Sequence, residues 1–270
     1  MFKLAAHLLV KDEEDIIEDC LDHLSEFCDY ILLLDTGSTD KTYEICKEHR
    51  NVTYIEKKKV VYNDALRQIL VEESRKYLNN QDWLLEVSAD HFFDSDPRLD
   101  IEKAISEGAN VITYDLAQFY FTDLDINYNN NEISVQRRLL YYAINYHNFP
   151  VAFQNQPNLK YTSQVTEWPE LQEKKIASFH PILKHYQFRS IEQIRKRLNV
   201  RFDQKKKGFK GFRHYRTDNW QRYIFDHNKL HKFDGTWKWD KQPSLDELLG
   251  FEDNKVRKML HKIKSYARRI

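Results

Sequence analysis

The feature that most constrains this chain is residues 30–42, YILLLDTGSTDKT, which join an apolar run to an acidic residue and a polar turn. Residues 30–34 have no polar interruption, which is typical of a strand buried on both faces of a sheet. Asp35 ends the run, and the turn-forming residues 36–39 lead into a helical pattern. In open α/β sheets ligands bind beyond the carboxyl ends of the strands. Asp35 is therefore expected to accept hydrogen bonds from a base or ribose.

The rest of the first hundred residues alternates between strand and helix patterns. Alternation of this kind indicates βαβ units and a largely parallel, Rossmann-like sheet. The expected strands are residues 4–10, 30–34, 52–56 and 83–87, and the expected helices are residues 13–27, 41–50 and 64–78.

Glycine usage limits how such a sheet can bind a nucleotide. The chain has six glycines, with no GxGxxG after a strand and no GxxxxGK[ST], so a dinucleotide fingerprint and a P-loop are excluded. The pyrophosphate of a bound nucleotide must be neutralised in another way. A divalent metal held by carboxylate is the expected device.

Five stretches, in this order and spacing, carry a family resemblance: VKDEEDIIEDCLDHL, DYILLLDTGSTDKTYEIC, YNDALR, DWLLEVSADHFF and KHYQFRSIEQ. Over roughly the first 190 residues the chain resembles the family-2 glycosyltransferases of the GT-A fold. The resemblance implies a mixed, mainly parallel α/β sheet flanked by helices. It also implies sugar transfer, usually with inversion, from a nucleoside-diphosphate sugar to an acceptor hydroxyl of a glycan or glycoconjugate. UDP is the commonest donor nucleotide of such relatives.

The resemblance further implies a donor site and a metal site. Asp35 holds the place of the base-recognising Asp, and Asp90 that of the Asp that binds Mn²⁺ or Mg²⁺. His185 matches the late His that completes the metal sphere. Ser88 departs from the usual first acid of the metal motif, which puts a ribose or metal contact in doubt. The full set of expected nucleotide-sugar contacts is Asp12, Glu13, Asp35, Gly37, Ser38, Asn63, Arg67, Ser88, Ala89 and Arg137.

The general base has two candidates. Glu167 in TSQVTEWPE resembles the family's acidic residue beyond the metal site, although Thr166 replaces the expected His. Asp115, at the end of the strand-like VITYD, is the competitor, and we prefer Glu167. His91 stands where many relatives have Glu, and either tunes the metal shell or faces solvent.

Each residue also has a structural alternative. Asp35 and Asp90 are residue types that cap turns, and a lone His such as His185 is often only a satisfied polar residue. Arg137, with its neighbour Arg138, fits a surface ion pair. His180 lies near His185 in the sequence but lacks its motif context.

The cysteines and the apolar segments bear on location. Cys20, Cys28 and Cys46 have neither CxxC spacing nor a His pair typical of zinc, and they resemble reduced core thiols of an intracellular protein. The apolar start is too short for a signal sequence, and no 18-residue apolar run exists. A cytoplasmic protein is expected.

The last third of the chain differs in charge. Residues 189–270 hold about 23 Lys and Arg against about 10 Asp and Glu. We expect a GT-A domain over residues 1–190 and a basic, aromatic-rich helical extension over residues 191–270 packed on it. Its aromatics are numerous enough either to build contacts with the core domain or to line an acceptor groove, and its KKKGFKGF loop is a candidate lid over the diphosphate.

Two alternatives to a glycosyltransferase stay open. One is a catalytically degenerate nucleotide-binding module, suggested by Ser88. The other is a nucleic-acid-binding protein that uses the basic tail, although we do not expect nucleic acid as a partner. Peripheral contact of the tail with the inner face of a membrane is a further option.

Overall fold

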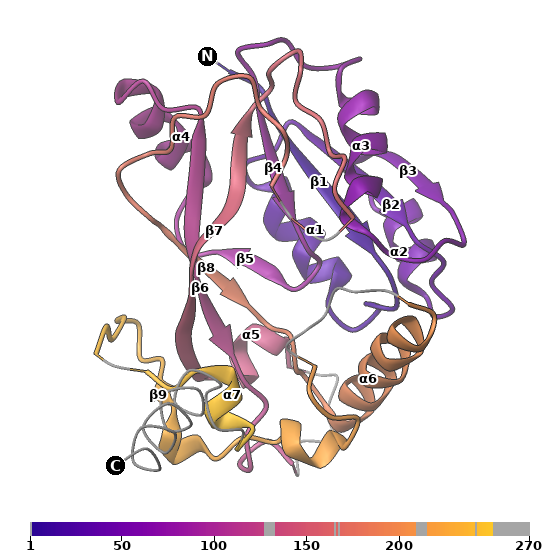
Figure 1. The fold of residues 1–270 in the computed structure, drawn as a ribbon, viewed down its shortest axis with the longest axis vertical. Coiled ribbons are helices and arrows are strands. Elements are labelled where there is room, and N and C mark those ends of the chain that lie inside the picture. The colour runs from indigo at the N-terminus through magenta and orange to yellow at the C-terminus, as the bar shows by residue number, and fades with distance from the viewer. Residues whose placement is uncertain are drawn as a thin grey trace, which may run out of the picture. The chain divides into compact units, whose positions relative to one another are not determined.

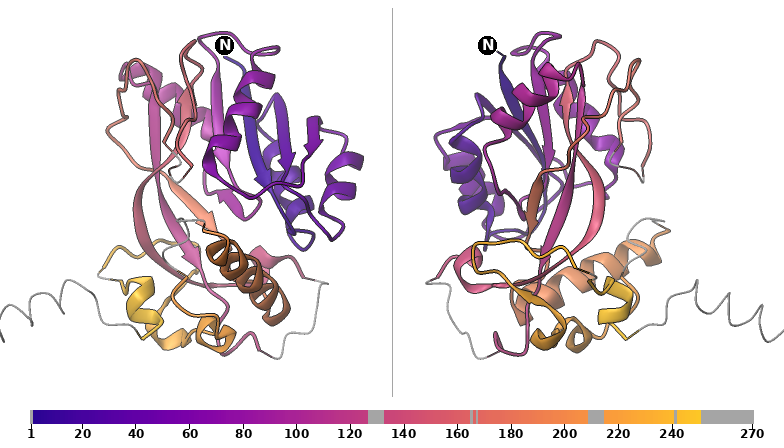
Figure 2. Two further views of the ribbon diagram at one scale, coloured as in Figure 1. Left: turned by 45° about the vertical axis from the view of Figure 1, so that its right-hand side comes forward. Right: turned by 90° about the vertical axis from the view of Figure 1, so that its left-hand side faces the viewer.

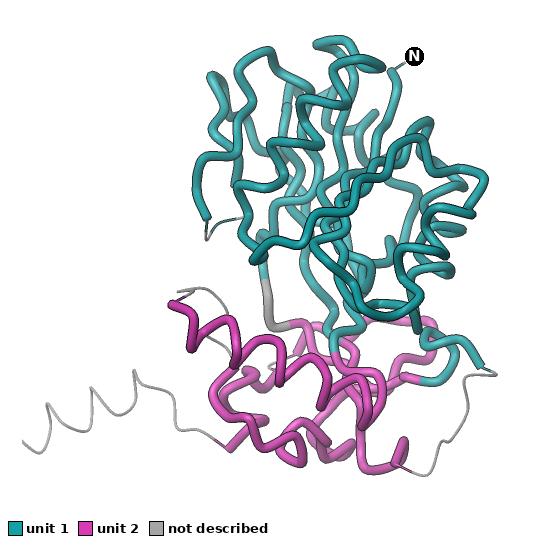
Figure 3. Tube along the Cα trace, turned by 90° about the vertical axis from the view of Figure 1, so that its right-hand side faces the viewer, with its two compact units in different colours: residues 1–118, 129–138, 146–187 teal, residues 119–128, 139–145, 188–270 magenta. Residues whose placement is uncertain are grey.

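The computed structural model describes residues 2–126, 133–164, 166, 168–208, 215–240 and 242–250. The chain forms two compact units, each built from several segments (Figure 3). Unit 1 comprises residues 1–118, 129–138 and 146–187, and unit 2 comprises residues 119–128, 139–145 and 188–270. The chain passes from unit 1 to unit 2 for the last time after Gln187, three residues before the domain boundary expected at residue 190. The two short segments 119–128 and 139–145 were expected in the first domain and group with unit 2.

The core of unit 1 is one mixed sheet with strand order β3-β2-β1-β4-β7-β6-β8-β5 (Figures 1 and 2). Its strands are β1 (Leu4–Val10), β2 (Tyr30–Asp35), β3 (Val52–Lys57), β4 (Trp83–Val87), β5 (His91–Phe93), β6 (Val111–Phe119), β7 (Tyr141–Gln154) and β8 (Ile182–His185). Its helices are α1 (Ile17–Ser25), α2 (Thr42–Glu48), η1 (Asp64–Leu66), α3 (Arg67–Ser74), α4 (Pro97–Ser106) and α5 (Val135–Arg138).

Helices lie on both faces of this sheet. On one face, Leu70 and Val71 of α3 share an apolar cluster with Leu84, Val111 and Phe153 of the sheet. On the other face, α4 contacts β6 where the Tyr114 hydroxyl donates to Asp100 at 3.1 Å. The ring of His23 in α1 stacks on Phe93, whose ring in turn contacts Tyr114. Strands buried on both faces read as apolar runs in the sequence.

Parallel pairing brings three strand ends to one edge. In register, Val10 of β1 lies beside Asp35 of β2, and Leu8 lies beside Val87 of β4. β1 separates β2 from β4, so the ends of those two strands are about two strand spacings, or about 10 Å, apart. The residues that follow β2 and β4 therefore share the carboxyl edge of the sheet, as the sequence predicted.

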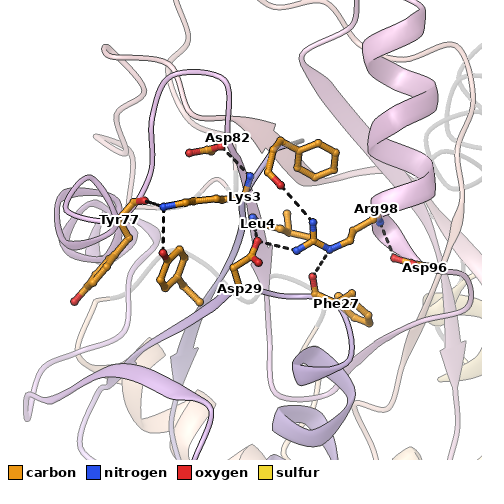
Figure 4. A network of polar contacts seen from close by, with 10 residues as sticks. Lys3, Leu4, Phe27, Asp29, Tyr77, Asp82, Asp96 and Arg98 are labelled. Atoms are coloured by element: carbon orange, nitrogen blue, oxygen red, sulfur yellow. Dashed lines mark hydrogen bonds and ion pairs between the residues drawn. The ribbon is translucent and has the colours of Figure 1, made fainter.

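The opposite, amino edge of the sheet is held by a polar network (Figure 4). The Asp29 carboxylate accepts from the Leu4 backbone N–H at 2.8 Å and from Arg98 at 2.7 Å. Arg98 also donates to the Phe27 carbonyl, and Asp82 accepts from the Lys3 backbone N–H at 2.8 Å. These bonds satisfy backbone groups at the starts of strands, where ladder bonds end.

Unit 2 contains α6 (Ile191–Lys206), η2 (Trp220–Tyr223), η3 (His227–Lys229), β9 (His231–Lys232) and α7 (Leu245–Leu248). α6 is capped by the Ser190 side chain, which accepts from the Gln193 backbone N–H. Short elements and ring contacts, rather than long helices, make up the described part of residues 215–250. Phe119, Tyr142, Phe233 and Trp237 form one such ring cluster, with Tyr142 and Trp237 centroids 4.9 Å apart.

The predicted fold class is confirmed: a mixed, mainly parallel α/β sheet flanked by helices. One strand end was wrong, because β6 continues four residues past Asp115 to Phe119. Within the described residues, no helix is long and apolar enough to cross a membrane. Neither Cys20 nor the other two cysteines forms a disulfide, and burial raises the pKa of the Cys20 thiol well above its usual value.

Candidate functional site

The turn after β2 is organised by Asp35. The Oδ1 atom of this buried carboxylate accepts from the backbone N–H groups of Gly37 and Ser38, both at 2.7 Å. The other oxygen, Oδ2, is buried and has no hydrogen-bond partner among the described residues. Asp35 thus caps the turn with one of its two oxygens, which is the structural role that its residue type suggested. A buried carboxylate oxygen without a donor is costly, and it is an acceptor available to a ligand.

Asp12, Glu13 and Ser38 join the β1 and β2 ends. The Asp12 N–H donates to Ser38 Oγ at 2.9 Å, and the Glu13 N–H donates to Thr42 Oγ1 at 2.8 Å. Asp12 has a positive φ of 55°, and its carboxylate accepts from the Thr39 N–H at 2.8 Å. These bonds hold the two loops together at the carboxyl edge. Contacts of these three residues with a nucleotide sugar remain a prediction.

Gly37 is required by geometry. Its φ is 105°, and a Cβ there would lie 3.2 Å from the Cα of Lys59. The segment after β3 runs against this turn, since the Lys58 N–H donates to the Asp35 carbonyl at 2.7 Å. Lys59 is exposed at this position. No sequence motif marks Lys59, because only the pairing of β3 with β2 places it beside the Asp35 turn.

The turn after β4 holds Asp90 against the end of β8. The Asp90 carbonyl accepts from the Tyr186 N–H at 2.9 Å, and Asp90 is 3% exposed. Its Oδ2 atom lies 3.5 Å from Nε2 of His185. Gln118 fixes the backbone of His185 by donating to its carbonyl at 3.1 Å. The structure therefore brings together the two residues that the sequence assigned to a metal.

His91 completes a group of three with Asp90 and His185. One ligand atom from each of the three residues lies within 4.8 Å of the others. His91 and His185 are register partners across β5 and β8, with ring centroids 4.7 Å apart. His91 is 3% exposed, so the solvent-facing alternative for this residue is wrong.

The group fits a divalent metal by its donors and its spacing. The 3.5 Å between Asp90 Oδ2 and His185 Nε2 exceeds a hydrogen bond. It is about 0.5 Å longer than the separation of about 3 Å between neighbouring ligands of one octahedral ion. The other ring nitrogen of His185, Nδ1, is buried without a hydrogen-bond partner among the described residues. Imidazole and carboxylate are both ordinary ligands of such ions.

Asp115 is not part of this group. In the β6–β8 register Gln118 lies beside His185, and Asp115 is three residues earlier on the same strand. Alternation along a strand sends side chains an odd number of residues apart to opposite faces. Asp115 instead accepts from the Asn148 N–H at 3.2 Å and lies 3.2 Å from Nδ1 of His147.

Arg67 is buried against the end of β4. It is 4% exposed, and its guanidinium donates to Glu86 on β4 at 2.9 Å. The other Glu86 oxygen lies 2.8 Å from Nδ1 of His7. Burial raises the pKa of Glu86, but His7 and Arg67 outweigh that effect and leave the pKa below its usual value. The structure gives Arg67 an internal partner, so a diphosphate contact remains a prediction.

The other predicted residues lie in different environments. Asn63 precedes η1, and its amide donates to the Val61 carbonyl at 3.3 Å. Ala89 is buried in the turn before Asp90, where the Ser88 carbonyl accepts from the His91 N–H at 3.0 Å. Arg137 is exposed on α5. Glu167 and the second half of the KKKGFKGF stretch, residues 209–212, lie outside the described residues.

A second group with ligand-type side chains occurs in unit 2, formed by Asp123, Asp226 and His227. Its polar atoms are used internally. Asp123 accepts from the backbone N–H of His227 at 3.0 Å, and Asp226 caps η3 by accepting from the Asn228 N–H at 3.0 Å. These bonds account for the geometry of the group without a ligand.

Comparison with known proteins gives distant structural similarities. No protein-family model and no curated protein matches the chain. The fold is similar to S. aureus TarS at 13% identity and a TM-score of 0.45, covering 73% of this chain and 39% of TarS. HddC from Yersinia pseudotuberculosis has 9% identity and a TM-score of 0.39, covering 68% of this chain and 93% of HddC. A 4-diphosphocytidyl-2C-methyl-D-erythritol synthase has 12% identity and a TM-score of 0.38, covering 57% and 76%. The chain thus spans about two fifths of the length of TarS, and similarity at this level does not decide function.

Proposed function

We propose that the chain is a metal-dependent glycosyltransferase of the GT-A type. It would move a sugar from a nucleoside-diphosphate donor, most simply a UDP-sugar, to a hydroxyl of a glycan or glycoconjugate. The reaction is a single in-line displacement that inverts the anomeric centre. In this proposal the protein works in the cytoplasm, where peripheral contact of its basic C-terminal region with a membrane remains open.

The observation that carries the proposal is the arrangement at the carboxyl edge of the sheet. The free Oδ2 atom of Asp35 follows β2, and the Asp90–His185 pair follows β4 and β8. β1 alone separates β2 from β4. The spacing of about 10 Å between these strand ends suits a ligand with a base at one end and a diphosphate at the other.

The described residues support distinct tasks. Asp35 Oδ2 would accept a hydrogen bond from the base, because its partner oxygen Oδ1 is already committed to the turn. Asp90 and His185 would hold a divalent ion, which supplies charge neutralisation at the leaving diphosphate when it is bound. Lys59, exposed beside Gly37, would add a positive charge on the nucleotide side.

The proton of the acceptor hydroxyl requires a base. We propose Glu167 for this role and retain Asp115 as the competitor. The register that sends Asp115 to the face opposite His185 favours Glu167. The carboxylate of Asp115 is also already engaged with Asn148.

The test is donor binding and donor turnover in one set of variants. Wild-type protein should hydrolyse or transfer from a UDP-sugar when Mn²⁺ is present, and UDP should raise its melting temperature. Asp90→Asn should reduce turnover by about 100-fold or more, the scale typical of a lost electrostatic group. The melting temperature without ligand should stay close to wild type. Unaltered turnover would remove Asp90 from the site.

A matched control lies at the amino edge of the sheet. Arg98→Met removes donors to Asp29 and Phe27, so it should lower the melting temperature and leave UDP affinity unchanged. The degenerate-module alternative is motivated by Ser88 in place of the usual acid. It predicts that UDP stabilises the protein while turnover stays at background in every donor and metal combination.

A further inference from the structure

Two tryptophans in unit 2 that are close in sequence have opposite environments. The ring of Trp237 packs against Phe233 at 4.4 Å and against Tyr142 at 4.9 Å, between ring centroids. Trp239 is 60% exposed, and its indole makes no hydrogen bond or ring contact with any described residue. Trp237 therefore stabilises the ring cluster, whereas Trp239 leaves its aromatic face open to a ligand.

The backbone that carries Trp239 is fixed by bonds to its neighbour Lys238. The Lys238 N–H donates to the Tyr142 hydroxyl at 2.8 Å, and the Lys238 carbonyl accepts from the Gln242 side chain at 2.8 Å. The Gln242 side-chain oxygen in turn accepts from the Ile144 N–H on β7. The segment has no regular secondary structure, yet β7 defines its path immediately before Trp239. A side chain on a fixed backbone loses less entropy when it binds a ligand.

The surroundings of Trp239 are polar but carry no net charge. Residues 231–240 hold two Lys and two Asp, so their formal charges cancel with His neutral. The side chain of Asp240 is 67% exposed, with Oδ1 3.2 Å from Nε2 of His231. Its other oxygen can accept hydrogen bonds from a ligand. An anionic membrane or a nucleic acid requires a positive surface, and this segment does not supply one.

The size of the exposed ring limits what can cover it. A Trp side chain has up to about 250 Å² of surface, so the exposed part is about 150 Å². A stable protein interface needs about 800 Å² from each partner. A single pyranose ring is of the right size, because it presents an apolar face of C–H groups and a rim of hydroxyls. The apolar face matches the indole, and the hydroxyls match the carboxylate of Asp240.

We propose that Trp239 and Asp240 form a saccharide-binding platform in unit 2, in which a neutral sugar ring stacks on the indole. The choice of a saccharide rests on the proposed function, whose acceptor is a glycan. The platform goes beyond that function by assigning a sugar contact to residues outside the carboxyl edge of the sheet. Stacking on an aromatic ring tolerates different sugars, so the platform gives affinity for a glycan and leaves the choice of the reacting sugar to other residues.

The experiment measures saccharide binding to the full chain by calorimetry and by tryptophan fluorescence. The probes are cellobiose, maltose, lactose and chitobiose, and sorbitol is a polyol without a ring. Trp239 is the most exposed of the five tryptophans, so acrylamide quenching reports mainly on its indole. Trp239→Ala and Trp239→Phe are the variants. Leu124→Ala, which removes another exposed apolar side chain of unit 2, is the matched control. Melting curves confirm that each protein folds.

We expect at least one disaccharide to bind wild type with a dissociation constant on the order of 1 mM and to shield the fluorescence from acrylamide. Sorbitol should do neither. Trp239→Ala should weaken the binding by at least about tenfold, and Trp239→Phe by a smaller factor because a ring remains. Leu124→Ala should bind as wild type does.

Three results would overturn the inference. One is no binding of any disaccharide at tens of millimolar, and another is equal affinity in wild type and Trp239→Ala. The third is binding to phosphatidylglycerol vesicles, or dimerisation in sedimentation, that requires Trp239 while no saccharide binds. The proposed function is tested separately by UDP binding and donor turnover. Saccharide binding without donor turnover would leave the platform in place and reject the glycosyltransferase.

Discussion

At the scale of single residues, the site depends on carboxylates with divided roles. Asp35 shows this most clearly, because one oxygen closes a turn and the other has no donor among the described residues. The two roles make different demands, since turn capping requires only an acceptor and base recognition requires the second oxygen as well. A substitution that preserves one and changes the other can separate them.

Asp35→Asn is that substitution. The amide keeps one acceptor for the Gly37 and Ser38 N–H groups, but replaces the free oxygen with a donor. We expect UDP affinity to fall by about tenfold or more, with unfolding free energy reduced by only about 1 kcal/mol. Calorimetry with UDP measures the affinity, and urea unfolding measures the unfolding free energy. Asp35→Ala should lose both, and wild-type UDP affinity in Asp35→Asn would exclude the second oxygen from the site.

Gly37→Ala tests the backbone of the same turn. The positive φ of 105° and the Lys59 Cα at 3.2 Å both oppose a Cβ. We expect a loss of about 1–2 kcal/mol in unfolding free energy and weaker UDP binding, because the turn positions Asp35. Gly108→Ala, with a φ of 70° and no neighbour within 4 Å, is the matched control for the backbone term alone. Equal losses in the two variants would show that contact with Lys59 adds nothing.

At the scale of elements, local pattern was informative where neighbouring segments pair. β1, β2 and β4 were placed almost to the residue, because apolar runs bounded by polar turns define central parallel strands. β5 and β8 were not predicted. β8 joins β5 and β6 across long stretches of chain, and no local periodicity encodes such partners. Asp115 was predicted at the end of a strand for the same reason. The prediction was wrong because β6 continues beyond it to Phe119.

The site residues were likewise predictable only where a local motif marked them. Asp90 and His185 are 95 positions apart in sequence, and only the motif context united them before β5 and β8 paired. The internal partner of Arg67 was not predictable either, because the Glu86 side chain lies in an apolar run that reads as buried. Its carboxylate is stabilised by His7 on a neighbouring strand and by Arg67 on α3, a three-element arrangement.

The buried ion pair of Arg67 and Glu86 yields an element-scale prediction. Arg67→Met leaves a buried carboxylate short of a partner and should cost about 3–5 kcal/mol of unfolding free energy. Adding Glu86→Gln should recover part of that loss, because the uncompensated charge is removed. A double-mutant cycle by urea unfolding measures the coupling. Equal stability of Arg67→Met and wild type would instead release Arg67 for ligand contact.

The same pair gives a pH dependence. The pKa of Glu86 is lower in the folded protein than its usual value, so its contribution to stability is present above about pH 4.3 and is lost as pH falls through the folded pKa. Wild type should therefore lose unfolding free energy more steeply below about pH 4.3 than Glu86→Gln does. Parallel acid titrations of the two proteins would not diverge if the ion pair contributed nothing.

At the scale of the whole molecule, unit 2 is assembled from chain segments on both sides of the predicted boundary. Phe225 bridges Thr122, and its N–H donates to the Phe121 carbonyl at 3.0 Å. Tyr142 contacts Trp237, and β9 pairs with the start of β7. Phe121, Thr122 and Tyr142, which precede the predicted boundary, therefore have partners beyond residue 215.

A fragment of residues 1–190 should consequently not behave as an independent domain. It would expose the rings of Phe119, Tyr120, Phe121 and Tyr142, all buried in the full chain. At about 150 Å² or more each, these rings form an apolar surface of about 600 Å², at the upper limit that soluble monomers tolerate. We expect the fragment to aggregate or to bind a hydrophobic dye, and co-expression with residues 188–270 to restore a soluble complex. A monomeric fragment with cooperative unfolding and no dye binding would instead show that unit 1 folds alone, because its sheet would then be stable with both segments unpartnered.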